Sequence, residues 1–265
     1  VYGIGNPLID VVVSCSDDEL AELKLAKGTM HLIEPERGEE ILASLTHKEK
    51  QYSPGGSCPN TMIALADFGS KTALGGMVGT DELGGIYRNQ LVGHGVHSHL
   101  SVHEGATGTS IVMVTPDSER TMNTHLGTCQ YFSRYEVSFE AIDAAEYLHF
   151  TGYMWDTESQ KDAILAAVAH AREAETPVVF DLADPFAAER NRDEFLELIR
   201  DHVDIVFANQ REAELLCETA DPQHSVRQLA KLAEVATVKD GASGSYIKER
   251  GGPLIEVPAA IAEPV

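Results

Sequence analysis

The sequence predicts an α/β fold: a doubly wound, mainly parallel sheet with helices on both faces (an α/β/α sandwich), accompanied by a small β-sheet lid. From residue 145 onward, short apolar runs alternate with amphipathic stretches, which is the pattern of repeated strand–helix–strand units. The run 178–182 (Val-Val-Phe-Asp-Leu) is nearly continuous in apolar character, as a buried parallel strand should be. Between 95 and 126 the pattern changes to alternating apolar residues with turns between them, which is typical of antiparallel hairpins.

Helix-boundary residues and apolar runs define the elements before residue 95. Pro59 has the fixed φ that suits the first turn of a helix, and Gly69 suits the position just after a helix end. The expected elements are, in order, a short opening strand, a helix over 17–25, a strand over 29–33, a helix over 35–45, a helix from the glycine pair at 55–56 to Gly69, a strand over 72–78 and a helix over 86–92.

After the hairpin region, strands and helices alternate regularly. Pro177 ends the first of these helices because proline cannot continue a helix. The expected strands and helices are strands over 147–151, 178–182, 204–208, 235–239, 245–248 and 254–257, and helices over 157–175, 192–202, 211–218 and 225–233. Sheets of this kind bind ligands beyond the carboxyl ends of their strands, so a site is expected there.

The length of 265 residues suits a single α/β domain spanning 1–265. The strands within about 11–33 and 95–126 are expected to form the separate small sheet, which would act as the lid. We find no internal repeat, low-complexity tract or long linker in the sequence.

The charge balance restricts the class of partner. The chain carries 20 basic and 42 acidic residues, for a net charge of −22. Nucleic acid and an anionic membrane surface would both be repelled by such a protein, so neither is expected as a partner. An anionic small molecule could still bind where N–H donors or a few basic side chains gather. No apolar run approaches the length needed to span a membrane.

The four cysteines lie far apart in sequence and form no Cys-x-x-Cys pair. We interpret them as reduced thiols of a cytoplasmic protein. Cys58 lies beside a glycine pair and could serve as a nucleophile, but no histidine stands near it in the sequence. A packed thiol is therefore the favoured interpretation of Cys58.

Four histidines lie close together in the hairpin region. A zinc site is one interpretation of such a cluster, and a strand with solvated histidines is the other. The second interpretation is favoured because no cysteine or further carboxylate cluster completes a ligand set. The histidines are His94, His97, His99 and His103.

The segment 53–60 (Ser-Pro-Gly-Gly-Ser-Cys-Pro-Asn) is the strongest local signal for a ligand site. Two adjacent glycines allow backbone angles and close approaches that a Cβ would block. Pro59 and the apolar residues after it predict a helix that begins at this turn. The N–H groups and positive end of such a helix can hold a polar ligand. The alternative is that the two glycines form only a tight turn.

Asp10 is an acidic residue set in an apolar run, between Ile9 and Val11. Burying its carboxylate without a partner would be costly. Asp10 either faces water at a strand end or accepts hydrogen bonds from the hydroxyl groups of a ligand, and its position alone does not separate these interpretations. Gly3 and Gly5 nearby do not form a dinucleotide fingerprint, because the third glycine and the following helix are missing. A Rossmann oxidoreductase is therefore disfavoured.

Four segments of the chain, taken in order, form a combination that is typical of one family. They are 5–10 (Gly-Asn-Pro-Leu-Ile-Asp), 55–60 (Gly-Gly-Ser-Cys-Pro-Asn) with Gly69, Gly79, Asp81, Gly84 and Gly85, 209–212 (Asn-Gln-Arg-Glu) and 238–244 (Val-Lys-Asp-Gly-Ala-Ser-Gly). The combination resembles the ribokinase-like carbohydrate and nucleoside kinases, also called the PfkB family. The resemblance covers nearly the whole chain, and the form of 5–10 is closest to that of adenosine kinases.

The resemblance implies a role for each segment. Arg120 would lie near the acceptor or the transferred phosphate, and it is the catalytic candidate within the chain. Mg²⁺ would be organised by Glu212 with Asn209. The nucleotide ATP would be held by Asn209, Lys239 and the turn from Gly241 to Gly244, and the family also admits a monovalent cation. The acceptor-binding residues would be Asn6, Asp10, Gly55, Gly56, Ser57 and Asn60.

The sequence departs from the family at its second signature, a Gly-Ala-Gly-Asp whose aspartate is the catalytic base. That signature should follow a strand such as 254–257, but no Gly-x-Gly-Asp occurs in the sequence. We expect the catalytic base to lie beyond Val265, in a continuation of the chain, so that these 265 residues alone would be inactive. The alternative is a complete, non-catalytic relative that retains an acceptor pocket.

Together these observations predict an ATP-dependent kinase that acts on a hydroxymethyl group of a nucleoside or a sugar. The segment 5–10 favours a nucleoside, as in adenosine kinases, whereas ribose, fructose and similar sugars share the scaffold. An aromatic platform for a purine would favour the nucleoside. The aromatic candidates are Tyr131, Phe132, Tyr153 and Trp155. The protein is expected in the cytoplasm, as a monomer or a homodimer.

Overall fold

The computed structural model describes residues 1–260, which divide into two compact units. The N-terminal unit consists of residues 6–132, and the C-terminal unit consists of residues 1–5 together with the chain from 133 onward. Over residues 1–260, no helix combines the length and the apolar character that crossing a membrane would require.

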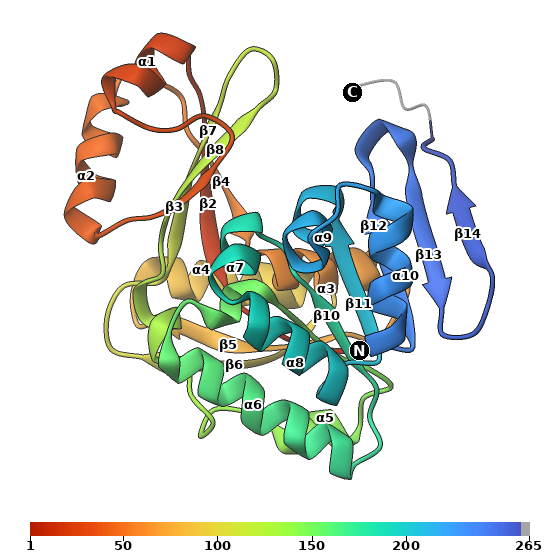
Figure 1. Cartoon of the computed structure of the whole chain (residues 1–265). Coiled ribbons are helices and arrows are strands. Elements are labelled where there is room, and N and C mark those ends of the chain that lie inside the picture. The colour runs from red at the N-terminus through yellow and green to blue at the C-terminus, as the bar shows by residue number, and fades with distance from the viewer. Residues whose placement is uncertain (261–265) are drawn as a thin grey trace. The chain divides into compact units, whose positions relative to one another are not determined.

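The C-terminal unit is built on the large, mainly parallel sheet that the sequence predicts (Figure 1). Its strands, in their order across the sheet, are β14 (Leu254–Val257), β13 (Ser245–Glu249), β12 (Val235–Lys239), β11 (Ile205–Asn209), β10 (Val178–Asp181), β9 (Leu148–Thr151) and β1 (Tyr2–Ile4). The pairs from β1 to β12 are parallel, and the last two, β12–β13 and β13–β14, are antiparallel.

Amphipathic helices cover the sheet of the C-terminal unit. In β10, Val178 and Phe180 are buried and alternate with the partly exposed Val179 and Asp181, so one face of this strand is closed off. A cluster of rings fills that core, with the centroids of Phe180 and Phe195 5.1 Å apart. The helices are α5 (Phe139–Asp143), α6 (Glu158–Glu173), α7 (Pro185–Arg190), α8 (Arg192–His202), α9 (Gln210–Cys217) and α10 (Pro222–Leu232), with short 3₁₀ turns η2 (Gly152–Trp155) and η3 (Gly241–Ser243).

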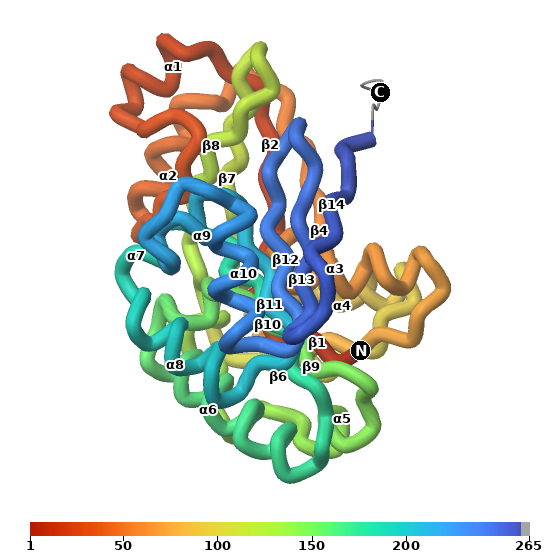
Figure 2. The backbone as a smooth tube through the Cα atoms, turned by 45° about the vertical axis from the view of Figure 1, so that its right-hand side comes forward, coloured from red at the N-terminus to blue at the C-terminus, as the bar shows by residue number. Residues whose placement is uncertain are grey.

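The N-terminal unit contains the predicted separate small sheet. Its strands, in order, are β3 (Met30–Leu32), β8 (Arg120–His125), β7 (Thr109–Val114), β2 (Leu8–Ser14) and β4 (Gln51–Gly55). The helices α1 (Asp17–Glu22) and α2 (Pro35–Ser44) lie against it, as both views show (Figure 2). Val13 and Met113 from the sheet and Leu20 and Ile41 from the helices form one buried cluster. This cluster accounts for the burial of Val13 on β2.

The rest of the N-terminal unit consists of β5 (Ala73–Gly79), β6 (His97–His103), α3 (Ser57–Asp67), α4 (Glu82–Gly93) and the 3₁₀ turn η1 (Gly127–Tyr131). The expectation that 95–126 forms antiparallel hairpins is only partly correct. β7 and β8 do pair antiparallel, but β6 pairs parallel with β5 and is not a strand of the small sheet. The small sheet is also mixed rather than antiparallel, because β7 lies parallel to β2 and β8 lies parallel to β3.

Candidate functional site

The glycine pair forms the junction between β4 and α3 in the N-terminal unit. Gly56 is the capping residue of α3, and its φ of 99° lies where residues with side chains are strained. A Cβ on Gly56 would lie 2.1 Å from the main-chain oxygen of Asn6. Among residues 1–260, no side-chain hydrogen bond caps the start of α3, and the positive end of a helix can hold a polar ligand. The predicted glycine turn at a helix N-terminus is therefore confirmed.

Asp10 lies directly over the other glycine of the pair. β2 and β4 pair antiparallel, with Leu8 opposite Gly55 and Asp10 opposite Ser53. A Cβ on Gly55 would lie 2.2 Å from an oxygen of the Asp10 carboxylate, so glycine is needed to make room for this carboxylate. Burial raises the pKa of Asp10 to about 6, and the positive charge of Arg120 opposes this rise. A half-buried carboxylate in this position is suited to accept hydrogen bonds from ligand hydroxyl groups.

Three further predicted acceptor residues flank the same turn. Asn6 is 8% exposed and precedes β2, with its main-chain oxygen against Gly56. Ser57 and Asn60 lie in the first turn of α3 and are exposed, and the N–H of Asn60 donates to the oxygen of Gly56 over 2.9 Å. The structure thus gathers the predicted acceptor residues of the N-terminal unit around one turn.

Arg120 lies apart from this group. It stands opposite Val114 at the start of β8, and Val114 in turn stands opposite Ser14. Ser14 is four residues along β2 from Asp10, which corresponds to about 13 Å in an extended strand. Arg120 therefore influences Asp10 through its charge, and its predicted place beside the acceptor or the transferred phosphate remains a proposal.

Asp81 and its neighbouring glycines hold the loop that leads into β7. The Asp81 carboxylate accepts hydrogen bonds from the N–H groups of Gly84, at 3.0 Å, and Thr107, at 2.9 Å. Burial alone would raise the pKa of Asp81, but these hydrogen bonds and that of the Thr107 hydroxyl lower it below its usual value. Added Cβ atoms on Gly79 and Gly84 would each lie 2.2 Å from a main-chain oxygen. The glycine–aspartate segment thus fixes the start of α4 and does not itself present a ligand group.

In the C-terminal unit, Asn209 and Glu212 form a reciprocal cap at the start of α9. The side-chain oxygen of Asn209 accepts from the N–H of Glu212, and the Glu212 carboxylate accepts from both the N–H and the amide nitrogen of Asn209, all at 2.7–2.8 Å. Glu212 is 1% exposed. Burial raises its pKa to about 7, a rise that the Asn209 N–H and the Lys239 charge oppose and the Asp181 charge reinforces.

The effect of the Glu212→Gln substitution on the free energy of unfolding is expected to differ between pH 5 and pH 8. The folded-state pKa of about 7 lies above the usual value near 4.5, so the folded state binds this proton more tightly than the unfolded state. Protonated Glu212 therefore contributes to the free energy of unfolding at low pH, and this contribution is lost as the pH rises through 7. Relative to the variant, the wild-type free energy of unfolding should fall by about 3 kcal/mol between these pH values. Urea unfolding of both proteins at both pH values tests this, and an unchanged difference would contradict it.

Other charged groups gather at the same edge, where β10, β11 and β12 end. Lys239 pairs with Asp181 over 3.0 Å. Asp184 is 5% exposed and caps α7, and burial raises its pKa. The phenol of Tyr153 donates to the main-chain oxygen of Ala183, and burial and the surrounding carboxylates raise its pKa. Asp181, Asp184, Glu212 and Lys239 thus lie at the carboxyl ends of neighbouring strands.

The turn between β12 and β13 has the shape expected from its glycines. Gly241 has a φ of 52° and Gly244 a φ of 99°, so both adopt angles that favour glycine. A Cβ on Gly244 would lie 2.0 Å from the main-chain oxygen of Val257, whereas one on Gly241 would meet no atom within 4 Å. Gly241 therefore leaves open space beside the end of β12.

The four aromatic candidates separate into core and surface residues. Phe132 is 1% exposed and Trp155 is 8% exposed, so both belong to the interior. Tyr131 is 52% exposed and its ring lies 5.0 Å from that of His103, and Tyr153 is half-buried. Tyr131 and Tyr153 are therefore the candidates that could still contact a ligand.

The structure gives no catalytic or metal-binding role to Cys58 or to the histidines of β6. Cys58 is fully buried and burial raises the pKa of its thiol, as expected for a packed side chain. His97 and His103 are exposed on β6. In residues 1–260, no group of three or more His, Cys, Asp and Glu side chains has the geometry to hold a metal ion.

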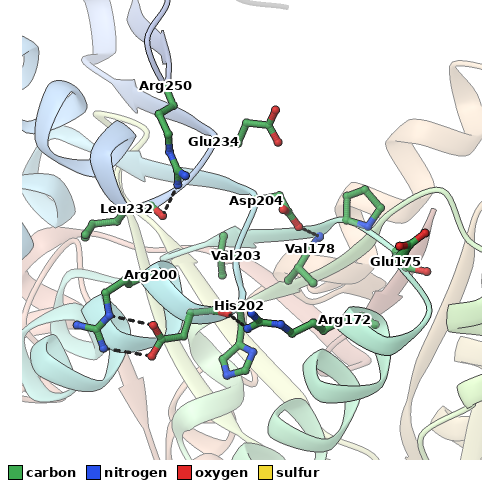
Figure 3. Close-up of a pocket in the computed structure, with 14 residues that line it drawn as sticks. Arg172, Glu175, Val178, Arg200, His202, Val203, Asp204, Leu232, Glu234 and Arg250 are labelled. Atoms are coloured by element: carbon green, nitrogen blue, oxygen red, sulfur yellow. Dashed lines mark hydrogen bonds and ion pairs between the residues drawn. The ribbon is translucent and has the colours of Figure 1, made fainter.

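A hollow of about 510 Å³ lies at the other end of the C-terminal unit's strands, beside Val178, Asp204 and Glu234 (Figure 3). Arg172 donates to the main-chain oxygen of Asp201 and Arg250 to that of Leu232. These arginines thus cap the carboxyl ends of α8 and α10, and this capping explains why arginines stand at these positions. The hollow does not contain any of the predicted site residues.

Curated proteins are similar to this chain in sequence. The adenosine kinase of Dictyostelium discoideum is 29% identical over 220 residues, which cover 80% of this chain and 63% of that protein. The guanosine-inosine kinase of Escherichia coli K12 is 25% identical over 259 residues, 93% of this chain and 59% of that protein. The chain thus spans about three fifths of the length of these curated relatives.

Solved structures and a family model identify the fold. The crystal structure of adenosine kinase from Sinorhizobium meliloti matches with a TM-score of 0.94 and 34% identity, covering all of this chain and 81% of that one. The fold is therefore the ribokinase-like α/β fold. The model of the pfkB family of carbohydrate kinases matches residues 28–265. With that match and these relatives, the chain belongs to the pfkB carbohydrate kinase family.

Proposed function

We propose that this protein is an ATP-dependent phosphotransferase that acts on the hydroxymethyl group of a nucleoside, converting adenosine and ATP to AMP and ADP. The observation that carries the proposal is the Asp10 carboxylate seated on Gly55, beside the uncapped start of α3. A carboxylate next to a helix N-terminus can bind the vicinal hydroxyls of a ribose, because a hydroxyl both donates and accepts hydrogen bonds. The four free cysteines favour the cytoplasm as its location.

A nucleoside is favoured over a free sugar by the relatives and by one surface feature. The three similar proteins described above are all named as nucleoside kinases. Tyr131 is exposed and offers a ring on which a base could stack, whereas a free sugar has no aromatic ring to stack there. A sugar kinase acting on ribose or fructose remains the alternative, since the Asp10 site recognises hydroxyl groups that sugars and nucleosides share.

On the nucleotide side, Lys239 and the Gly241–Gly244 turn would receive ATP. The ammonium group of Lys239 supplies a positive charge for phosphate, and the open space at Gly241 lets a ligand approach the main chain. Both oxygens of Glu212 already accept hydrogen bonds from Asn209, so these residues fit Mg²⁺ held through its water shell and not a direct ligand cage. When bound, Mg²⁺ would neutralise charge on the phosphate oxygens.

The predicted position of the catalytic base lies outside residues 1–260, so the structure does not test it. The small sheet carries Asp10 and would act as the lid that excludes water, which otherwise competes as a phosphoryl acceptor. Without a base the same residues would make a binding protein, which is the non-catalytic alternative.

The proposal is tested by measuring ADP release from Mg²⁺-ATP in the presence of adenosine, inosine, guanosine, ribose or fructose. The natively expressed protein is used, and its intact mass is compared with 28.7 kDa. We expect ADP release that depends on a nucleoside and is absent with 5′-deoxyadenosine, which lacks the reacting hydroxyl. Binding of a nucleoside without ADP release would identify the non-catalytic relative. Failure to bind any of these compounds would contradict the proposal.

A further inference from the structure

Lys239 and Asp181 form an ion pair across the end of an intervening strand. The ammonium nitrogen of Lys239 lies 3.0 Å from a carboxylate oxygen of Asp181. Lys239 ends β12 and Asp181 ends β10, and β11 lies between these two strands. Neighbouring strands are about 4.8 Å apart, so the two strands of the pair are about 10 Å apart. The side chain of Lys239 therefore reaches across the end of β11.

This ion pair directs the ammonium group of Lys239 away from the glycine turn that would receive the nucleotide. The turn, Gly241–Gly244, joins β12 to β13, and β13 lies on the opposite side of β12 from β11. An ammonium group held at Asp181 leans toward β10, whereas a phosphate beside the turn needs that group nearer to β12. Asp181 and a bound phosphate would therefore compete for the same ammonium group.

Asp181 is the fixed member of the pair. Its other carboxylate oxygen accepts from the N–H of Ala183 over 3.1 Å, and the main-chain oxygen of Ala183 accepts from the hydroxyl of Tyr153 over 3.3 Å. Ala183 has a φ of 62°, which costs energy for a residue with a Cβ, so these two hydrogen bonds help to hold the turn. The Lys239 side chain is 49% exposed and that of Asp181 is 24% exposed. Because lysine has a long flexible stem, Lys239 is the member that can move to a phosphate.

Moving Lys239 to a phosphate would leave a group of carboxylates without its nearby positive charge. Burial raises the pKa of Glu212 to about 7, and the charges of Asp181 and Asp184 add to this rise while that of Lys239 opposes it. Without Lys239, these carboxylates would repel a metal-free nucleotide. A nucleotide that arrives with Mg²⁺ meets less repulsion, and Asp181 could then accept hydrogen bonds from the water shell of the ion.

We infer that Asp181 is a specificity-determining residue of the nucleotide site, which holds Lys239 in an ion pair that a phosphate must break and so disfavours nucleotide without Mg²⁺. The inference rests on the proposed function for the identity of the ligand. The Asp181→Asn variant keeps a side-chain oxygen that can accept from the N–H of Ala183, but it has no charge with which to hold Lys239. The ammonium group is then available to a phosphate at no cost.

The test measures the Kd of ATP by calorimetry, first in EDTA and then in excess Mg²⁺, with no acceptor present. We expect Asp181→Asn to bind metal-free ATP about fivefold more tightly than the wild type, and to change the Kd of Mg²⁺-ATP by less than about twofold. Asp201→Asn is the matched control. Asp201 pairs with Arg200 beside the hollow at the other end of the strands, so its substitution makes the same change in net charge away from the site. Asp201→Asn should leave both Kd values within about twofold of the wild type.

A second background separates the breaking of the ion pair from simple repulsion between Asp181 and phosphate. In the Lys239→Met protein there is no ion pair to break. Asp181→Asn should therefore tighten the binding of metal-free ATP by a smaller factor in this background, about twofold. Equal gains in the two backgrounds would show that phosphate leaves the ion pair intact, and this result would overturn the inference.

The remaining outcomes also decide the inference. Asp181→Asn that leaves metal-free ATP binding unchanged, weakens it, or tightens the binding of ATP equally with and without Mg²⁺ would overturn the inference alone. If neither the wild type nor Asp181→Asn bound ATP, the nucleotide side of the proposed function would be contradicted together with the inference. ATP binding that changes as expected, without ADP release in the presence of any acceptor, would support the inference and count against the proposed phosphotransfer.

Discussion

The Asp10→Asn variant is expected to bind the acceptor about 100-fold more weakly than the wild type while binding ATP normally. Its carboxylate rests on Gly55 and is available to ligand hydroxyls, and hydrogen bonds to a charged group each contribute about 1.5–3 kcal/mol. Asparagine has nearly the same shape but no charge, so the loss reports on charge and not on packing. The Asp10→Ala variant should lose at least as much. Calorimetric Kd values for adenosine and ATP measure both effects.

The pH dependence of binding provides an internal control for the role of Asp10. Burial raises its pKa to about 6, so the carboxylate is ionised above this pH and protonated below it. If the acceptor hydroxyl donates to the ionised form, affinity should be constant above pH 7 and fall about tenfold for each unit below pH 6. In Asp10→Asn this dependence should be absent.

A matched substitution separates the acceptor site from the general effect of a buried carboxyl. Asp156 lies in the C-terminal unit with its side chain 2% exposed, pairs with Arg190, and has its pKa raised to about 6 by burial. Asp156→Asn should leave acceptor affinity and its pH profile unchanged. Two results would contradict the role of Asp10 in the acceptor site. One is an equal loss of acceptor and ATP binding in Asp10→Asn. The other is a fall in affinity below pH 6 that also disappears in Asp156→Asn.

The elements that could be predicted from the sequence are those with a local signal. The helix 192–202 and the strand 235–239 match their predictions residue for residue, since an amphipathic period or an apolar run marks each one. β4 was not predicted, because its sequence Gln-Tyr-Ser-Pro-Gly lacks alternation. It is a strand because it lies at the edge of the small sheet beside β2, where Pro54 is tolerated.

Other differences come from partners that are remote in sequence. The sequence of β6 alternates as in a hairpin strand, but its partner is β5, which lies more than 20 residues earlier. No local sequence pattern predicts that pairing. The helix α7 did have a signal that could have identified it: Asp184 is a capping residue and Pro185 suits the first helical position.

The sequence predicts which residues belong to the candidate site, but it does not predict the tertiary contacts that hold them in place. The grouping of Asp10 with the glycine pair follows from the antiparallel pairing of β2 with the unpredicted β4. The contact between Tyr87 and Gly55 spans 32 residues, and Tyr87 has no feature that distinguishes it from a core residue of an amphipathic helix. Anchoring contacts of this kind depend on tertiary packing, so they become visible only in the folded chain.

The Gly56→Ala variant is expected to lose about 3 kcal/mol or more of its free energy of unfolding. Its φ of 99° and ψ of 134° are strained for any residue with a Cβ, which costs on the order of 1–3 kcal/mol. In addition, the Cβ would lie 2.1 Å from the main-chain oxygen of Asn6, and a main-chain atom cannot move aside as a flexible side chain can. The junction between β4 and α3 would have to shift. Urea unfolding monitored by circular dichroism measures the loss.

Gly85→Ala is the matched control, because it makes the same chemical change in the same unit. Gly85 lies within α4, and a Cβ there would meet no atom within 4 Å. Alanine is favoured over glycine inside a helix by about 0.5–1 kcal/mol, so Gly85→Ala should stabilise the protein. The two substitutions should therefore change stability in opposite directions. If Gly56→Ala proved as stable as the wild type, the left-handed turn would not be required, and the close approach of Asn6, Gly55 and Asp10 could not be the basis of the acceptor site.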